Sequence, residues 1–130
     1  KLITIEIDDE LETLAKKYIV KSGLQDKIVQ RIGAALEIIP ALKESFDLVF
    51  IDADKREYVA YYQAVFDKVQ NGGYIIADNT LWSGKVLEKP EADDEQTMGI
   101  LEFNNLIKRD KRVEKVILPL RDGMTIIRKK

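Results

Sequence analysis

The chain has 130 residues, 45% hydrophobic and 34% charged, with a formal net charge of −2; this fits one domain over residues 1–130 and excludes the basic field that nucleic-acid partners need. Cysteine and histidine are absent, which excludes disulfides, thiolate or imidazole metal ligands and a Ser-His-Asp triad, and leaves acid–base work to carboxylates, lysine or tyrosine. No membrane span or signal peptide is recognisable, so the sequence predicts no membrane partner and is typical of a cytoplasmic protein.

Strands and helices alternate along the first part of the chain. Residues 2–7 alternate in polarity and predict a strand, followed by a helix that starts at Asp8 or Asp9, with Glu12 completing a capping box. Gly23 is expected to end that helix. Its expected apolar stripe consists of Leu11, Leu14, Ala15, Tyr18 and Ile19. A strand at Ile28–Ile32 and a second helix follow, with Pro40 near the start of that helix or kinking it.

The second part of the chain continues the alternation. Residues 48–51 form an unbroken apolar run, which predicts an interior strand of a parallel sheet covered by helices on both faces. The next helix is expected to run from residue 58 to 69, closed by Asn71-Gly72-Gly73, before a strand at 74–77 and a loop at 80–95. A helix at 97–108 precedes two antiparallel strands, Val113–Leu118 and residues 124–128. The order predicts an α/β fold whose mostly parallel sheet ends in an antiparallel C-terminal pair.

Oxygen-bearing side chains follow two consecutive strands of this predicted sheet. Asp52 comes directly after residues 48–51, and Asp78 and Asn79 come directly after residues 74–77. If the two strands are neighbours, these side chains converge at one point. Two carboxylates and an amide suit Mg²⁺ or Ca²⁺ and suit zinc or copper poorly. The sequence therefore favours a metal site over the alternative, which is two unrelated helix caps.

Two further residues near strand ends have a functional and a structural interpretation. Lys55 lies three residues beyond Asp52, where it is either a base whose pKa a nearby cation lowers or an exposed loop lysine. Glu6 lies at the end of the first strand, where it either binds both hydroxyls of a ribose or is an acid favoured by the following helix dipole.

Two other classes of protein share part of this pattern. A receiver-type phosphoacceptor domain would use Asp8-Asp9 as its acidic pair, Asp52 as acceptor and Thr80 as its threonine, but its lysine before proline after the fifth strand is missing. The Asp52-Ala53-Asp54 run matches the metal motif of nucleotide-sugar transferases, which is only three residues long.

Four stretches together resemble one family. They are Thr4-Ile5-Glu6, then Phe50-Ile51-Asp52-Ala53-Asp54-Lys55 with Tyr58, then Asp78-Asn79 with Leu81-Trp82, Gly84 and Val86, and finally Leu118-Pro119-Leu120 with Asp122-Gly123. In this order they resemble the cation-dependent, S-adenosylmethionine-using O-methyltransferases of the catechol and caffeoyl-CoA type. The resemblance implies a Rossmann-like methyltransferase sheet. It also implies an enzyme that methylates one hydroxyl of a phenolic small molecule.

The resemblance also implies a role for each matching residue. Lys55 is the implied base, and Asp52, Asp78 and Asn79 are the implied ligands of a divalent cation, with Mg²⁺ favoured and Ca²⁺ or Mn²⁺ as alternatives. Ser83 is implied to lie near the substrate, and the intact protein is implied to be a homodimer. The residues implied to contact the cofactor are Glu6, Ala35, Asp52, Asp54 and Tyr61.

The chain departs from the family pattern in two places. Ala34 stands where family members usually have a polar residue that contacts the adenine. The family's first strand and its glycine-rich loop are missing, so the chain corresponds to the C-terminal part of such an enzyme. We expect the missing strand to belong between residues 4–7 and 48–51, which leaves unpaired backbone groups on both.

Overall fold

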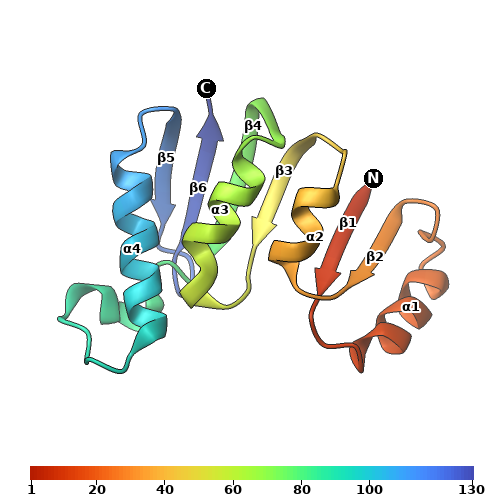
Figure 1. Ribbon diagram of the computed structural model, residues 1–130, viewed down its shortest axis with the longest axis horizontal. Helices are drawn as coiled ribbons and strands as arrows, with labels where there is room; N and C mark the ends of the chain where they lie inside the picture. Colours follow the sequence, from red (N-terminus) through yellow and green to blue (C-terminus); the bar gives the residue numbers. More distant parts are fainter. The chain divides into compact units, whose positions relative to one another are not determined.

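The computed structural model describes all residues from 1 to 130 and divides them into two compact units, Lys1–Lys43 and Glu44–Lys130. No helix is long and apolar enough to cross a membrane. The elements, labelled in Figure 1, are β1 (Leu2–Glu6), α1 (Leu11–Lys21), β2 (Ile28–Ile32), α2 (Ala35–Ala41), β3 (Phe46–Ile51), η1 (Lys55–Glu57), α3 (Tyr58–Phe66), β4 (Val69–Asp78), η2 (Trp82–Leu87), α4 (Glu95–Arg109), β5 (Val113–Leu118) and β6 (Met124–Lys129).

The first unit is a two-stranded parallel sheet with two helices. β1 pairs with β2 in parallel from Leu2↔Ile28 to Glu6↔Ile32, and α1 makes the connection between them. Gly23 follows α1 with φ +71°, which confirms its predicted place just after the helix. The predicted capping box is wrong, because α1 starts after Glu10 and the Asp8 carboxylate accepts from the Glu10 amide at 3.0 Å instead. Asp8 thus forms a local turn rather than a helix cap.

Most of the expected apolar stripe of α1 is exposed in this unit. Leu11, Leu14 and Tyr18 expose 42%, 52% and 57% of their surface. A unit of two strands and two short helices offers too little surface to bury them. Pro40 lies in the last turn of α2, not at its start; it has no amide hydrogen to donate to the Leu36 carbonyl, and the helix ends one residue later, at Ala41.

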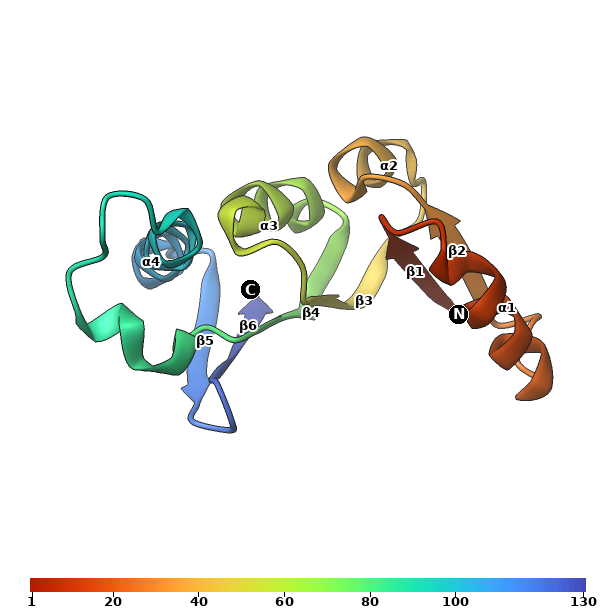
Figure 2. The same ribbon diagram turned by 90° about the horizontal axis from the view of Figure 1, so that it is seen from below.

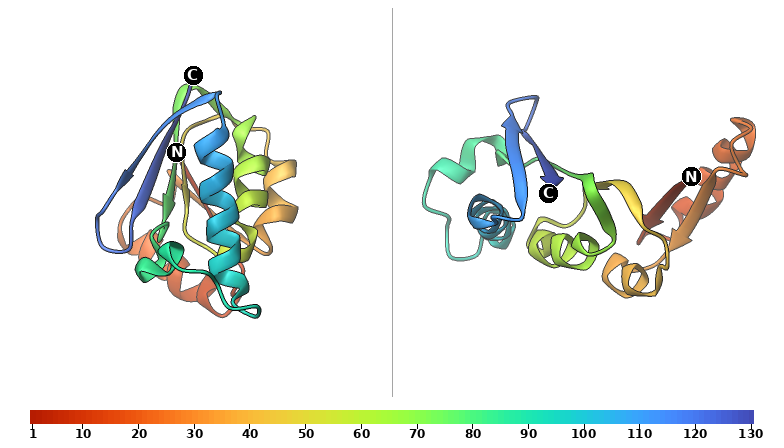
Figure 3. Two further views of the ribbon diagram at one scale, coloured as in Figure 1. Left: turned by 90° about the vertical axis from the view of Figure 1, so that its left-hand side faces the viewer. Right: turned by 90° about the horizontal axis from the view of Figure 1, so that it is seen from above.

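The second unit is a four-stranded mixed sheet in the order β3-β4-β6-β5. β3 and β4 are parallel, and β6 runs antiparallel to both β4 and β5, which confirms the α/β class and the antiparallel C-terminal pair. Figures 2 and 3 show α3 and α4 side by side on one face of this sheet. The core between these helices and the sheet includes Tyr58, Tyr62, Val65, Phe66, Ile75, Ala77, Ile100, Phe103, Ile107 and Ile127.

The other face of this sheet carries exposed apolar side chains. Leu48 and Phe50 on β3 are each 53% exposed, whereas Ile51, which points to the opposite face, is 5% exposed. Helices therefore cover β3 on one face, and the expected cover on both faces is not present within Glu44–Lys130.

The end of α3 differs from the sequence-based prediction. The helix ends at Phe66, and Asn71-Gly72-Gly73 lies inside β4, which starts at Val69. The pairing with β3 shifts register there, from Phe46↔Val69 to Leu48↔Tyr74. The glycines accommodate this irregularity: Gly72 has φ +83°, and a Cβ at Gly73 would lie 2.9 Å from the Val69 side chain. The glycine pair, which by sequence predicts a helix end, instead serves this bulge.

The two sheets are separate. β1 pairs only with β2, and β3 pairs only with β4, so each has one edge without a partner strand. These are the two strands between which the sequence predicts a missing strand.

Candidate active site

Asp52 and Lys55 follow the end of β3, and their side chains contact each other. Lys55 Nζ donates to Asp52 Oδ1 at 3.0 Å. The two side chains differ in exposure, since Lys55 exposes 8% of its side chain and Asp52 exposes 51%. Lysine side chains are seldom buried without a partner or a function. The pair therefore consists of a buried amine that faces an accessible carboxylate.

Tyr58 joins this pair to the ends of two neighbouring strands. Lys55 Nζ donates to Tyr58 Oη at 2.7 Å, and the tyrosine hydroxyl lies 3.0 Å from the Asp78 carbonyl and 3.3 Å from the Ile51 carbonyl. Tyr58 is completely buried. Burial, followed by the negative charges of Asp52 and Asp78, raises the pKa of Tyr58 well above its usual range, so its hydroxyl stays protonated.

Asp78 and Asn79 lie at the end of the strand beside β3. The parallel register pairs Ile51 with Ala77, so Asp52 and Asp78 are the next residues on their two strands. Asn79 adopts the left-handed conformation with φ 58°, and its amide donates to Asp78 Oδ1 at 2.7 Å. This register confirms that the two strands are neighbours, which the predicted convergence requires; the convergence of the side chains themselves stays a prediction.

The loop after Asn79 is fixed by the turn between β5 and β6. Thr80 and Leu81 donate their amides to the carbonyls of Gly123 and Asp122 at 3.0 Å and 2.9 Å. The Asp122 carboxylate also accepts from the Ser83 amide. A Cβ at Gly123, which has φ +81°, would lie 2.4 Å from Leu81 Cγ. The Asp122-Gly123 part of the sequence motif therefore acts by holding this loop.

Trp82 lies next to the buried lysine in this loop. Its ring centroid is 5.9 Å from Lys55 Nζ, close enough for a cation–π contact. Its Nε1 is buried and has no hydrogen-bond partner. Trp82 and Ser83 both have positive φ, 48° and 53°, and such backbone strain in non-glycine residues tends to occur at functional sites.

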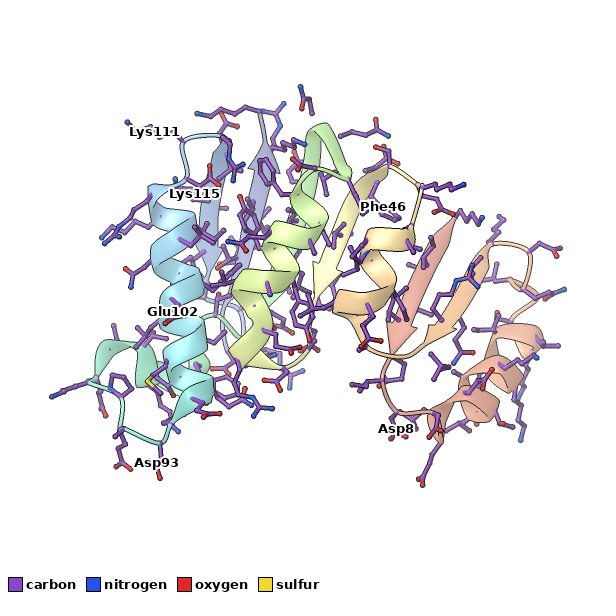
Figure 4. All side chains as sticks on the ribbon, viewed as in Figure 1. Asp8, Phe46, Asp93, Glu102, Lys111 and Lys115 are labelled. Carbon is purple, nitrogen blue, oxygen red and sulfur yellow. The ribbon has the colours of Figure 1, made fainter.

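The loop between residues 80 and 95 contains more order than the sequence suggests. It includes η2, and Lys85 in η2 donates to Asp94 at 2.9 Å. Asp94 also caps α4 by accepting from the Thr97 amide at 3.0 Å. Figure 4 shows Asp93 at the outer turn of this loop, just before α4.

Two of the residues implied to contact the cofactor already have protein partners. The Asp54 carboxylate accepts from the Arg56 amide at 3.0 Å, from the Arg56 guanidinium and from Gln96 Nε2 at 3.2 Å. The Arg56 side-chain hydrogen bond lowers the pKa of Asp54 to about 2. The Tyr61 hydroxyl bonds the Glu57 carboxylate. Any further contact of Asp54 or Tyr61 must compete with these bonds or use other atoms.

Two more of the five residues implied to contact the cofactor, Glu6 and Ala35, lie in the first unit. Glu6 is the last residue of β1, and its Oε1 accepts from the Asp8 amide at 3.0 Å. Ala35 is the first residue of α2, after β2. Because β1 and β2 are parallel and Glu6 pairs with Ile32, Glu6 and Ala35 follow the same end of this small sheet. Both belong to the unit Lys1–Lys43, whereas the other site residues belong to Glu44–Lys130.

The donor set at the ends of β3 and β4 fits a hard divalent cation. Asp52 and Asp78 supply carboxylate oxygens and Asn79 supplies an amide oxygen, the ligand types that Mg²⁺ and Ca²⁺ prefer. Lys55 uses one oxygen of Asp52 and leaves the other available. No three acidic, histidine or cysteine side chains are arranged so that they could hold a metal ion together, so water and substrate oxygens would have to complete the coordination.

Sequence reasoning missed three residues that hold this site together. Gln96 Oε1 accepts from the Lys55 amide at 3.0 Å. A Cβ at Gly99 would lie 2.4 Å from the Lys55 carbonyl oxygen, so α4 can pack here only with glycine. Tyr58 belongs to the sequence motif, but nothing in that motif indicates its bond to Lys55.

The family comparison covers the whole chain. The model of the family described as O-methyltransferase matches residues 1–130. Caffeoyl-CoA O-methyltransferase 1 of Eucalyptus globulus is 37% identical over 139 residues, which cover 99% of this chain and 56% of that protein. Caffeoyl-CoA O-methyltransferase 1 of Arabidopsis thaliana is 34% identical and is covered to 54%. The chain thus spans about half the length of the curated relatives that it matches.

Solved structures give the same result. The O-methyltransferase of Bacillus cereus in complex with SAH superposes with a TM-score of 0.90 at 28% identity, covering 98% of this chain and 62% of that one. The SAH-bound methyltransferase PaMTH1 of Podospora anserina superposes with a TM-score of 0.86 at 26% identity, covering 98% of this chain and 60% of that one. The receiver-type interpretation of Asp52 has no support in these matches.

Proposed function

The chain belongs to the O-methyltransferase family, and on this premise we propose that the intact protein transfers a methyl group from S-adenosylmethionine to a hydroxyl of a catechol-like small molecule, using a divalent cation. The relatives in complex with SAH, the demethylated product of S-adenosylmethionine, support the cofactor. The homodimer implied by the family resemblance is part of the same proposal.

The observation that carries the proposal is the buried amine of Lys55. Methylation of a hydroxyl oxygen releases the hydroxyl proton, and a base has to accept it. The chain contains no histidine or cysteine. Lys55 Nζ is buried, and it lies 3.0 Å from Asp52 at the edge of the sheet where Asp78 and Asn79 also end their strand. We therefore assign the proton transfer to Lys55 Nζ.

Asp52, Asp78 and Asn79 are the residues that would hold the cation. A bound Mg²⁺ would lower the pKa of a chelated hydroxyl and fix its orientation. Trp82 Nε1, a buried donor without a partner beside Lys55, suits an acceptor that carries oxygen atoms. Ser83 follows Trp82 and is proposed to lie near the same acceptor.

The residues proposed to contact the cofactor are those that the family resemblance implies. Glu6 ends β1 with a carboxylate that can accept hydrogen bonds from the two ribose hydroxyls. Ala35, Asp54 and Tyr61 are proposed to line the same cofactor. Asp54 and Tyr61 would contribute surface and backbone, because their polar ends are engaged with Arg56 and Glu57.

The test measures formation of S-adenosylhomocysteine by the full-length protein with Mg²⁺ and either catechol or phenol as acceptor. Catechol should be methylated and phenol should not, because only a vicinal diol offers two oxygens to a cation. EDTA and the variant Asp78→Ala should both abolish turnover. Asp93→Ala, which removes an exposed acid of the loop before α4, is the matched control and should leave it unchanged. Full turnover in EDTA would refute the metal-dependent part of the proposal, and absence of turnover with any vicinal diol would refute the substrate class.

A further inference from the structure

The amine of Lys55 is held by few groups. Its side chain makes two hydrogen bonds, to Asp52 Oδ1 at 3.0 Å and to Tyr58 Oη at 2.7 Å. Lysine has a flexible four-carbon stem with high rotamer entropy, so it is poorly ordered unless its end is restrained. Asp52 is half exposed and is itself a proposed cation ligand. The second partner, Tyr58, is therefore the one that can restrain the amine in every state of the site.

Tyr58 is fixed independently of Lys55. It is fully buried at the start of α3. Its ring packs edge-to-face against Phe103 of α4, with centroids 5.5 Å apart and an interplanar angle of 83°. Its hydroxyl is also close to the backbone carbonyls of Ile51 and Asp78, the last residues of β3 and β4.

The hydrogen-bond directions follow from the number of donors. A phenol has one hydrogen, and the shorter distance of 3.0 Å gives that hydrogen to the Asp78 carbonyl rather than to the Ile51 carbonyl at 3.3 Å. The hydroxyl oxygen then has a lone pair that faces the Lys55 amine. Tyr58 thus connects Lys55 to the backbone of Asp78 through one oxygen atom.

We propose that Tyr58 is a positioning residue, which holds Lys55 Nζ beside Asp52 and ties its location to the ends of β3 and β4. The inference rests on the proposed function, because Lys55 has to be the base for its position to affect turnover. It assigns Tyr58 no contact with cofactor or acceptor. Removing the hydroxyl should leave the fold intact but free the lysine side chain.

The experiment uses the full-length protein with Tyr58→Phe, and with Tyr62→Phe as the matched control. Tyr62 lies on the same helix, is 1% exposed, and loses a hydroxyl that bonds Asp110 instead of Lys55. Phenylalanine keeps both rings and their packing, and cooperative thermal unfolding confirms that each variant is folded. Tyr58→Phe should lower kcat roughly 10-fold to 100-fold, with KM for cofactor and acceptor changed less than about twofold; Tyr62→Phe should not change kcat.

Two further measurements distinguish positioning from general damage. In a Lys55→Met background, Tyr58→Phe should have no further effect on kcat, because the group that it positions is gone. Separately, acetylation of Lys55 Nζ by acetic anhydride, which releases acetate and is followed by peptide mass spectrometry, should be several-fold faster in Tyr58→Phe than in Tyr62→Phe.

The outcomes separate the two hypotheses. An unchanged kcat in Tyr58→Phe, or an equal loss in the Lys55→Met background, overturns the positioning role while the proposed function stands. If the wild-type protein methylates no acceptor, the proposed function fails, but the labelling rate still tests whether Tyr58 restrains Lys55 Nζ. An equal labelling rate in the two variants overturns that restraint.

Discussion

A single methyl group added at Gly99 should test how closely the lysine is held. Gly99 lies in α4, and a Cβ at this position would be 2.4 Å from the Lys55 carbonyl oxygen and 2.7 Å from the Arg56 Cα. Non-bonded carbon atoms prefer about 3.5–4.0 Å. Gly99→Ala must therefore push η1 and α4 apart by about 1 Å.

Two opposing terms set the magnitude for stability. Overpacking of this kind costs about 1–3 kcal/mol, whereas alanine in place of glycine inside a helix stabilises by about 1 kcal/mol. The net effect should be a loss of stability of up to about 2 kcal/mol. The effect on turnover should be larger, because the displaced backbone is that of Lys55, and a 1 Å shift of a reacting group can cost roughly 10²-fold.

The assay compares the thermal unfolding midpoint and kcat of full-length Gly99→Ala with those of Glu102→Ala. Glu102 is an exposed residue of the same helix (Figure 4), so its replacement controls for a general change in α4. Gly99→Ala should lose at least 10-fold in kcat at a temperature where it is fully folded. If Gly99→Ala matches Glu102→Ala in both measurements, the close approach of α4 to Lys55 does not determine the geometry of the site.

Three other predictions follow from single features of the structure. Lys55→Met should lower kcat by roughly 10²-fold or more, with unchanged affinity for S-adenosylmethionine by calorimetry; an unchanged kcat would make Lys55 a structural residue. The pKa of Asp54 is about 2 in the folded protein, below its value of 3.8 in an unfolded chain, so its contribution to stability is complete above about pH 4 and is lost as the pH falls towards 2. Urea unfolding of Asp54→Asn should therefore show a weaker loss of stability over this range than wild type, and identical curves would contradict the assignment. Residues 1–130 expressed alone should self-associate, because β1 and β3 each have an unpaired edge; a monomeric, cooperatively unfolding species in sedimentation and calorimetry would contradict this.

The sequence predicted the residues at strand ends because their placement depends on local pattern and on one general rule. Each buried run marks a strand, and parallel neighbours end at the same edge of a sheet. Asp52 and Asp78 follow two such runs, and the register Ile51↔Ala77 places them as expected. The Tyr58 hydroxyl lies 3.0 Å from the Asp78 carbonyl and 3.3 Å from the Ile51 carbonyl, so the two strand ends are close.

The sequence did not predict what depends on contacts between distant segments. Gly99 is 44 positions after Lys55 in the sequence, and nothing in its own helix indicates that a backbone carbonyl lies against it. The predicted end of α3 was wrong for a related reason. A glycine pair after an apolar helix is the usual sign of a helix end, but Gly72 and Gly73 serve a register shift in β4 that only the pairing with β3 reveals.

The division of the chain has a consequence for how the proposed site can fail. The residues assigned to proton transfer and cation binding all lie within Glu44–Lys130, where Tyr58 and the β3–β4 pairing fix their geometry. Glu6 and Ala35, assigned to the cofactor, lie on the small sheet of Lys1–Lys43, which buries few apolar side chains. The two sheets share no hydrogen-bonded strands, so damage to one need not distort the other. Substitution of Glu6 or Ala35 should therefore weaken cofactor binding and leave the geometry around Lys55 intact, whereas substitution of Asp52, which is assigned to both the cofactor and the cation, should affect both functions.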